Sequence, residues 1–347
     1  MRSGLSAWIE RAWYDDGFGR LLLWPFTLLY SLIIAIRRSL YRIGAMSSTG
    51  VPVPVIVVGN IVAGGAGKTP VTLYLAQALK ARGMRPGIVS RGYGREDESR
   101  LLEVTRSSNS AEVGDEPLLL ARRSGCAVFV GRDRVAAARL AIEGGADVLI
   151  ADDGLQHYRL RRDFEICVVD GSRGLGNGLQ LPAGPLREPA SRLATVDVVM
   201  VNVTGVTDVP AGVSGAVHVV PFSLEAAEAT SLDGSESKPL EAFAGAPVDA
   251  VAGIGNPERF FRLLERHGLT VVRHPLADHA GFDPNRVAPG AGRAILVTEK
   301  DAVKLDPLTA GSVWYVPVEL QIDNAAGSTL LDTIETRCRQ VQDRKHE

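Results

Sequence analysis

Residues 59–70, with the sequence GNIVAGGAGKTP, have the residue types and spacing of a loop that binds phosphate. The loop follows the apolar run Val53–Val58 and precedes a segment with helical spacing, which is the setting such a loop needs. Its glycines allow backbone N–H groups to point at phosphate oxygens, and the helix N-terminus adds a positive dipole end. We expect Lys68 to reach the β- and γ-phosphates and Thr69 to hold Mg²⁺. The predicted nucleotide-binding residues are Gly64, Gly65, Ala66, Gly67, Lys68, Thr69 and Pro70.

The loop departs at one position from the strict pattern GxxxxGK[ST]. That pattern requires a glycine at position 62, where this chain has Val62, and the glycines that follow are expected to compensate. The alternative is a glycine-rich turn that contains a lysine by chance. Since only six of the 38 basic residues are lysines, a lysine at this point of the loop favours the functional interpretation.

A second acidic element follows an apolar strand. Residues 148–153 read VLIADD, so Asp152 and Asp153 stand at the carboxyl end of a strand that is expected to lie beside the loop. Paired acids at a strand end can also serve only as turn or helix caps. Next to a phosphate loop, however, they favour a bound Mg²⁺. The guanine-reading motif NKxD is absent from the sequence, which favours ATP as the nucleotide.

The N-terminal region contains sixteen residues without a charge, Leu21–Ile36. As a helix this run extends about 24 Å, short of a hydrocarbon core of about 30 Å. A signal peptide is disfavoured because the apolar stretch is long and no A-x-A site follows. A buried core helix remains an alternative to a membrane anchor, which we favour. Thr27, Tyr30 and Ser31 form a narrow polar stripe on the helix. The arginines that follow the run predict that the rest of the chain lies in the cytoplasm.

The composition is that of a globular protein, because 46% of the 347 residues are hydrophobic and 22% are charged. The net charge of −2 provides no basic field for nucleic acid, so we expect none as a partner. Three distant cysteines without a CxxC motif argue against disulfides and zinc. No obligate protein partner is evident from the sequence.

From residue 51 onward, short apolar runs alternate with helical patterns, which predicts a mostly parallel sheet with helices on both faces. The expected fold is α/β and P-loop NTPase-like, with a smaller second α/β domain and an N-terminal apolar, membrane-associated helix. A polar stretch, SLDGSESKP, marks a loop or linker early in the second domain. The expected divisions are 1–50 for the membrane-associated segment, 51–222 for the P-loop core, 223–335 for the second domain and 336–347 for a frayed polar tail.

Further motifs resemble one family, the tetraacyldisaccharide 4′-kinases, also called LpxK. The matching stretches are GNIVAGGAGKTP (59–70), SRGYGR (90–95), VGDEP (113–117), ADDGLQH (151–157), DGSRGLGNGLQLPAGPLREP (170–189), AGIGNPERF (252–260), ADH (277–279) and TEKDAVK (298–304). The resemblance covers about residues 5–335 and implies a reaction in which ATP phosphorylates the 4′-hydroxyl of an acylated glucosamine disaccharide 1-phosphate. It also implies a lipid IVA product and a location on the cytoplasmic face of the bacterial inner membrane.

The resemblance implies roles for individual residues. Lys68 would serve catalysis, and Asp115 would accept the proton of the acceptor hydroxyl with His279 as its partner. The implied metal residues are Thr69, Asp152, Asp153 and Glu188, and the other implied site residues are Glu116, Gln156, His157, Arg187 and Asn256.

Structural alternatives remain open. Asp115 is also a suitable helix N-cap, the basic residues after His157 can form a solvated face, Arg187 and Glu188 can pair with each other, and TEKDAVK can be structural. The family usually has a second histidine after His279, whereas this chain has Ala280.

The alternative function is a membrane-associated P-loop ATPase switch of the partition or division-site type. Those proteins carry a KGGxGKT loop, and this chain has Ala63 where their first lysine stands. They also attach through a terminal amphipathic helix rather than an all-apolar run. Both differences favour the kinase.

Overall fold

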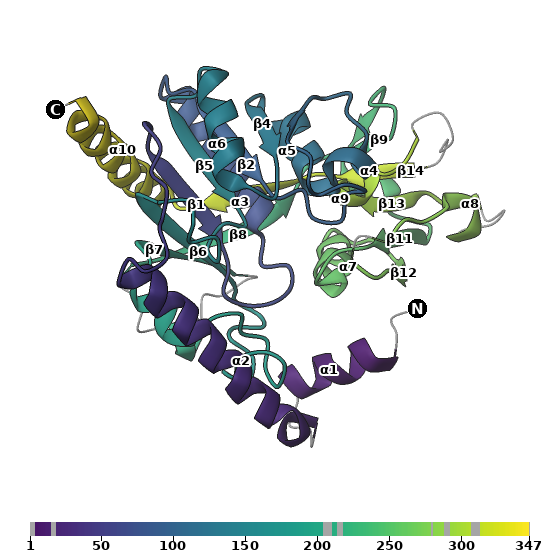
Figure 1. Cartoon of the computed structure of the whole chain (residues 1–347). Helices are drawn as coiled ribbons and strands as arrows, with labels where there is room; N and C mark the ends of the chain where they lie inside the picture. The colour runs from purple at the N-terminus through teal and green to yellow at the C-terminus, as the bar shows by residue number, and fades with distance from the viewer. Residues whose placement is uncertain are drawn as a thin grey trace.

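The computed structural model describes residues 4–14, 19–203, 210–213, 218–278, 280–287, 292–306 and 313–346. Within them the chain forms two sheets and a separate N-terminal helical segment (Figure 1). That segment contains α1 (Gly4–Tyr14) and α2 (Gly19–Arg42), and α2 lies along the lower edge of the molecule in Figure 1.

The larger sheet has nine strands in the described residues, in the order β15-β8-β7-β6-β1-β5-β2-β4-β3. The strands at its centre are short runs of β-branched residues, and β1, β5, β6 and β7 are buried along their whole length. All neighbouring pairs are parallel except β15 with β8 and β3 with β4. The bounds are β1 Val55–Gly59, β2 Pro86–Ser90, β3 Leu102–Val104, β4 Ala127–Val130, β5 Val148–Asp152, β6 Phe164–Asp170, β7 Val198–Asn202, β8 Val219–Ala226 and β15 Val318–Ile322.

Helices cover both faces of this sheet, as the sequence predicts. One face carries α3 (Lys68–Ala81), α5 (Asp115–Ser124) and α10 (Asn324–His346) on a core of aliphatic side chains. The other face carries α6 (Arg134–Glu143) and the short 3₁₀ helix η1 (Ala190–Ala194). Two shorter helical elements of this part of the chain are α4 (Ser110–Val113) and η2 (Ala211–Val213).

The smaller sheet has six strands in the described residues, in the order β10-β9-β14-β13-β11-β12. Its bounds are β9 Ala229–Ser231, β10 Ser237–Lys238, β11 Val248–Ala252, β12 Val271–Pro275, β13 Ile295–Thr298 and β14 Val313–Val316. Four of these strands are parallel neighbours, and α7 buries two phenylalanines against one face of the sheet. The helices of this unit are η3 (Leu240–Phe243), α7 (Pro257–Arg266), α8 (Pro284–Val287) and α9 (Glu299–Ala302).

The C-terminal region differs from the expected division. After β14 the chain returns to the larger sheet, where β15 pairs antiparallel with β8. The helix α10 then packs on the same sheet, and Cys338 and Val341 are buried. The expectation of a frayed tail over 336–347 is therefore wrong for residues 336–346. One side of this polar helical segment packs on the larger sheet, which buries its few apolar side chains. The smaller sheet and its helices, here called the second unit, accordingly end at β14.

Candidate active site

The phosphate loop connects β1 to α3 at the carboxyl edge of the larger sheet. Gly64 and Gly67 have φ angles of 108° and 96°, values that favour glycine, and Asn60 Nδ2 donates to the carbonyl oxygen of Gly64 at 3.1 Å. The helix α3 begins at Lys68, so Lys68 and Thr69 occupy its first turn. The free N–H groups of a first helical turn and the helix dipole favour a bound anion.

Val62, which replaces the glycine of the strict pattern, has a structural explanation. It is buried and forms an isolated antiparallel bridge with Leu186. The phosphate loop is thus held from outside by another segment of the chain, and an apolar side chain fills that contact.

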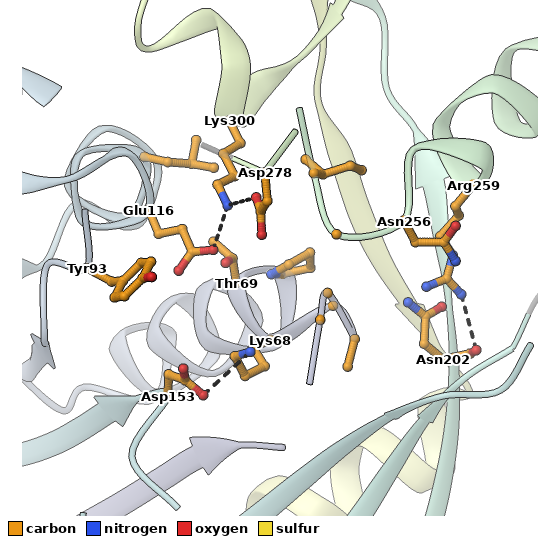
Figure 2. Close-up of a pocket in the computed structure, with 18 of the residues that line it drawn as sticks. Lys68, Thr69, Tyr93, Glu116, Asp153, Asn202, Asn256, Arg259, Asp278 and Lys300 are labelled. Atoms are coloured by element: carbon orange, nitrogen blue, oxygen red, sulfur yellow. Dashed lines mark hydrogen bonds and ion pairs between the residues drawn. The ribbon is translucent and has the colours of Figure 1, made fainter. Parts of the chain in front are cut away.

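Asp153 lies just beyond β5 and faces the phosphate loop. Its Oδ1 is 3.5 Å from Lys68 Nζ, and its Oδ2 is 3.3 Å from Arg187 Nη1 (Figure 2 shows the lysine contact). Asp152 is buried instead and accepts hydrogen bonds from Thr72 Oγ1 at 3.0 Å and Ser90 Oγ at 3.4 Å. The two neighbouring carboxylates therefore have different roles, and Asp153 is the one that lines the cavity.

The two carboxyl groups also differ in pKa. Burial, together with the nearby Glu116 and Asp153 charges, raises the pKa of Asp152 to about 6. Burial opposes ionisation of Asp153 too, but the cations Lys68, Arg187 and Arg134 outweigh it and hold the pKa of Asp153 at about 2. Asp153 is consequently a carboxylate at neutral pH, held among cations that a phosphate group can also use.

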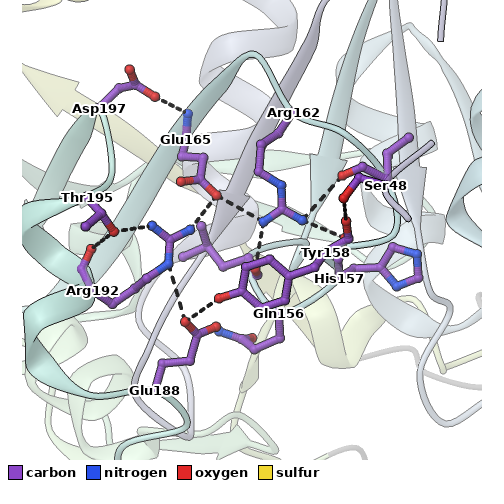
Figure 3. Close-up of polar contacts among 12 residues, drawn as sticks. Ser48, Gln156, His157, Tyr158, Arg162, Glu165, Glu188, Arg192, Thr195 and Asp197 are labelled. Atoms are coloured by element: carbon purple, nitrogen blue, oxygen red, sulfur yellow. Dashed lines mark hydrogen bonds and ion pairs between the residues drawn. The ribbon is translucent and has the colours of Figure 1, made fainter. Parts of the chain in front are cut away.

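Glu188 does not join this group. Its side chain is 1% exposed, and its Oε2 accepts from Tyr158 Oη at 2.7 Å and lies 3.3 Å from Arg192 Nε (Figure 3). Arg192 also pairs with Glu165, which pairs in turn with Arg162 at 3.0 Å. These contacts hold Glu188 Oε2, whereas Oε1 has no hydrogen-bond partner among the described residues, and the side chain is not in the cavity wall. The role of Glu188 as a metal ligand therefore stays a prediction.

Gln156 and His157 lie in the cavity wall. Gln156 Nε2 donates to the carbonyl oxygen of Asn60 at 3.0 Å, which ties it to the start of the phosphate loop. Burial, with Arg134 and Arg162 nearby, lowers the pKa of His157 to about 4, so this imidazole is neutral at pH 7.

A loop of the second unit packs against the phosphate loop. A Cβ built on Gly255 would lie 2.3 Å from the Gly65 nitrogen, so the loop between β11 and α7 is in direct contact with the phosphate loop. Asn256, in the same loop, lines the cavity and donates from Nδ2 to Asp170 Oδ2 at 3.2 Å.

Two lysines of the second unit reach the N-terminus of α5. Lys300 Nζ lies 3.0 Å from Glu116 Oε1 and 3.0 Å from Asp278 Oδ1 (Figure 2). Lys304 Nζ lies 3.6 Å from Asp115 Oδ2 and donates to Asp301 Oδ1 at 2.8 Å.

The motif TEKDAVK therefore links the two units at the residues GDEP. His279 lies outside the described residues, so its pairing with Asp115 stays a prediction.

Asn202, Arg259 and Arg134 are among the polar residues of the cavity that sequence reasoning missed. Asn202 ends β7 and is fully buried, and its side-chain Nδ2 and Oδ1 have no hydrogen-bond partner among the residues that the structure describes. Its backbone oxygen accepts from Arg259 Nη2 at 3.2 Å (Figure 2). Arg134 begins α6 and is buried beside Asp153, so burial lowers its pKa to about 10. The position of Asn202 at the end of a buried strand, at the same edge as Asp152, was the available signal.

These residues surround a single large cavity of about 1050 Å³. It reaches from the phosphate loop and the second unit to the N-terminal helix, whose Tyr30, Ile34 and Arg37 form part of its wall. The volume is slightly above the usual range for ligand pockets, about 300–1,000 Å³. The cavity therefore has room for a nucleotide and a second substrate.

The first turn of α3, Lys68 and the carboxylate of Asp153 meet at one end of the cavity. Proteins that bind nucleoside triphosphates and transfer their phosphoryl groups have the same arrangement. The fold and the site thus define a P-loop phosphotransfer protein. The sequence profile of one family, described as tetraacyldisaccharide-1-P 4′-kinase and called LpxK, matches residues 19–335. The chain belongs to this family.

Individual relatives agree with the family match. The tetraacyldisaccharide 4′-kinase of Alkalilimnicola ehrlichii is 49% identical over 308 residues, which cover 88% of this chain and 90% of the relative. That of Shewanella sp. (strain ANA-3) is 40% identical over 345 residues and covers 99% of both chains. A crystal structure of LpxK from Aquifex aeolicus in complex with ATP superposes with a TM-score of 0.75 at 30% identity, over 92% of this chain and 99% of that one.

Proposed function

We propose that this chain transfers the γ-phosphoryl group of ATP to the 4′-hydroxyl of tetraacyldisaccharide 1-phosphate, which gives lipid IVA in lipid A biosynthesis. The observation that carries the proposal is the shared cavity, because the phosphate loop and an apolar N-terminal helix are two walls of the same space. A kinase that joins a water-soluble nucleotide to a lipid acceptor requires that arrangement. The family match supports the identity of both substrates.

At the nucleotide end, the first turn of α3 and Lys68 offer N–H donors and a positive charge to the phosphates. Arg187 adds a second cation 3.3 Å from Asp153. Mg²⁺, when bound, neutralises charge on the transferring phosphoryl group. The Thr69 hydroxyl and the Asp153 carboxylate are the oxygen donors of the cavity suited to hold it.

Among the described residues there is no cluster of three or more histidine, cysteine or acidic side chains that could hold a metal ion. The donor set of Thr69 and Asp153 fits Mg²⁺, which keeps several waters and is usually held by one or two carboxylates and the substrate phosphates. We include Mg²⁺ in the proposal on this basis.

At the acceptor end, Asp115 is the proposed base. It is a buried residue at the N-terminus of α5, and its neighbour Glu116 lines the cavity. Lys304 of the second unit holds its carboxylate. A positioned carboxylate that accepts the hydroxyl proton contributes roughly 10²- to 10⁴-fold to the rate. His279 remains the proposed partner of Asp115.

The membrane contact is proposed for α2. Among the described helices, α2 has the length and composition of a membrane span, with a mean hydropathy of 1.7, yet one side of it is in contact with protein. The opposite side exposes large apolar side chains, such as Leu22 at 70% and Phe26 at 62%. A helix attached along one side cannot be surrounded by lipid, so we propose that it lies in the interface on the cytoplasmic face of the inner membrane.

One experiment separates this function from the ATPase switch. ATP turnover is measured with and without tetraacyldisaccharide 1-phosphate in mixed micelles, and phosphorylated lipid is quantified alongside ADP. A kinase forms phospholipid in step with ADP and needs the acceptor for turnover. ADP release that is independent of the acceptor, without lipid product, would refute the proposal.

A further inference from the structure

One side of α2 makes hydrogen bonds to the segment Gln180–Glu188, here called the 180–188 segment. Thr27 Oγ1 donates to the carbonyl oxygen of Gln180 at 3.2 Å and accepts from the backbone nitrogen of Ala183 at 2.9 Å. Tyr30 Oη donates to the carbonyl oxygen of Arg187 at 3.0 Å. These contacts come from the narrow polar stripe of an otherwise apolar helix, and Thr27 is 4% exposed.

The same segment is hydrogen-bonded on its other side to the phosphate loop. The Arg187 backbone nitrogen donates to the carbonyl oxygen of Ile61 at 2.7 Å, and the Ala63 nitrogen donates to that of Pro185 at 2.8 Å. The 180–188 segment is thus a strip of backbone between the N-terminal helix and the loop that binds phosphate.

The carboxyl end of this strip, Arg187 and Glu188, is also held by side chains. The Arg187 guanidinium contacts Asp153 in the cavity. Glu188 is held by Tyr158 and Arg192 in the network of Figure 3, and Arg38 of α2 lies 3.8 Å from its Oε2. An anchor that served only to reach the membrane would need none of these polar contacts at the site.

We propose that α2 is part of the catalytic architecture as well as the membrane contact, and that Thr27 and Tyr30 are positioning residues for Arg187 and the phosphate loop. They act through the 180–188 segment, because both hydroxyl groups bond to its backbone. This inference rests on the proposed kinase function, to which it adds that the membrane helix sets the geometry of the phosphate site.

The physical cost of losing these bonds is local. The Ala183 N–H is buried, so removal of the Thr27 hydroxyl leaves a donor without its partner. A phosphoryl transfer that depends on positioned charges is sensitive to such shifts, since misplacement by about 1 Å can cost about 100-fold. Thr27 does not line the cavity, so its effect must pass through the segment.

The test uses the full chain with Tyr30→Phe and Thr27→Val, each of which removes one hydroxyl group. Ser39→Ala, which removes an exposed hydroxyl from the same helix, is the matched control. The kcat and the KM for the acceptor are measured in mixed micelles at saturating ATP, along with vesicle flotation and Tm. Hydrogen exchange of peptides covering 60–66 and 180–188 is measured without either substrate.

We expect kcat to fall about 3- to 10-fold for Tyr30→Phe and about 10-fold or more for Thr27→Val, from the usual strength of such hydrogen bonds. The acceptor KM and flotation should stay near wild type, while exchange rises in both peptides. Ser39→Ala should match wild type throughout.

Two results would overturn the inference. If both variants keep the wild-type kcat and exchange pattern, α2 is an anchor only. If they raise the acceptor KM at unchanged kcat, α2 binds the acceptor directly and does not position Arg187. A wild-type enzyme that forms no lipid product refutes the proposed function instead, and the exchange measurement still tests the positioning.

Discussion

The contact between the second unit and the phosphate loop makes Gly255→Ala a sharp perturbation. The added methyl group would lie 2.3 Å from the Gly65 nitrogen and 3.0 Å from its Cα, where ordinary contacts begin at 3.4 Å. Both atoms belong to the backbone, so no side-chain rotation relieves the clash. Gly255 does not have a positive φ, and alanine therefore adds no backbone strain of its own. One of the two loops must move by about 1 Å, and a displacement of that size can lower the rate by about 100-fold.

The assay for Gly255→Ala compares kcat and ATP affinity with those of wild type, and Tm reports whether the fold is intact. Gly50→Ala is the control, because its methyl group meets nothing closer than an Arg161 side-chain atom at 3.8 Å and its φ is also unexceptional. We expect a large loss of kcat for Gly255→Ala, with a Tm within a few degrees of wild type. Wild-type kinetics in this variant would show that the two loops separate freely during turnover, and the reasoning would fail.

The remaining predictions test single groups of the site and the membrane face. Lys68→Ala should lower kcat by at least ~10²-fold because it removes the positive charge that neutralises the transferring phosphoryl group. Near-normal activity of the folded variant would contradict the phosphate-loop assignment. Asp115→Asn should lower kcat by about 10²- to 10⁴-fold with little change in ATP affinity, and an unchanged kcat would exclude it as the base. Leu29→Asp with Leu32→Asp should abolish vesicle flotation at unchanged Tm, since both side chains are exposed on α2; retained flotation would mean that another surface binds lipid. Asp152→Asn should change the pH dependence of stability. The raised pKa, about 6, means that the folded state binds more protons than the unfolded state between about pH 4 and 6, so wild-type stability falls through this window as pH rises and the variant should lack that fall. A difference in unfolding free energy that does not vary with pH would contradict the raised pKa.

The parts of the fold that the sequence predicts are those with local signals. The β1–loop–α3 unit follows from a valine-rich run, a glycine loop and a helical pattern within about 30 residues, and the structure has it as β1 and α3. The placement of Asp152 and Asp153 follows from the apolar run of β5. Local hydrophobic periodicity determines such elements, because each strand or helix buries its own apolar side.

The parts that the sequence does not predict depend on contacts between distant residues. Nothing near Val318–Ile322 indicates that this strand pairs with β8, almost a hundred residues earlier. The direction of Glu188 is also decided at a distance, by Tyr158 and Arg192, although its neighbour Arg187 does reach the site. The polar stripe of α2 was visible in the sequence, whereas its attachment to the 180–188 segment was not.

The most direct test of the central claim is phosphoryl transfer from γ-labelled ATP to tetraacyldisaccharide 1-phosphate by the full chain in mixed micelles. The position of the new phosphate is determined by NMR of the isolated lipid, and Lys68→Ala is run in parallel. The shared cavity predicts label at the 4′ position, one phosphorylated lipid for each ADP, and loss of at least ~10²-fold in the variant. ADP formation without labelled lipid, or equal transfer by Lys68→Ala, would contradict it.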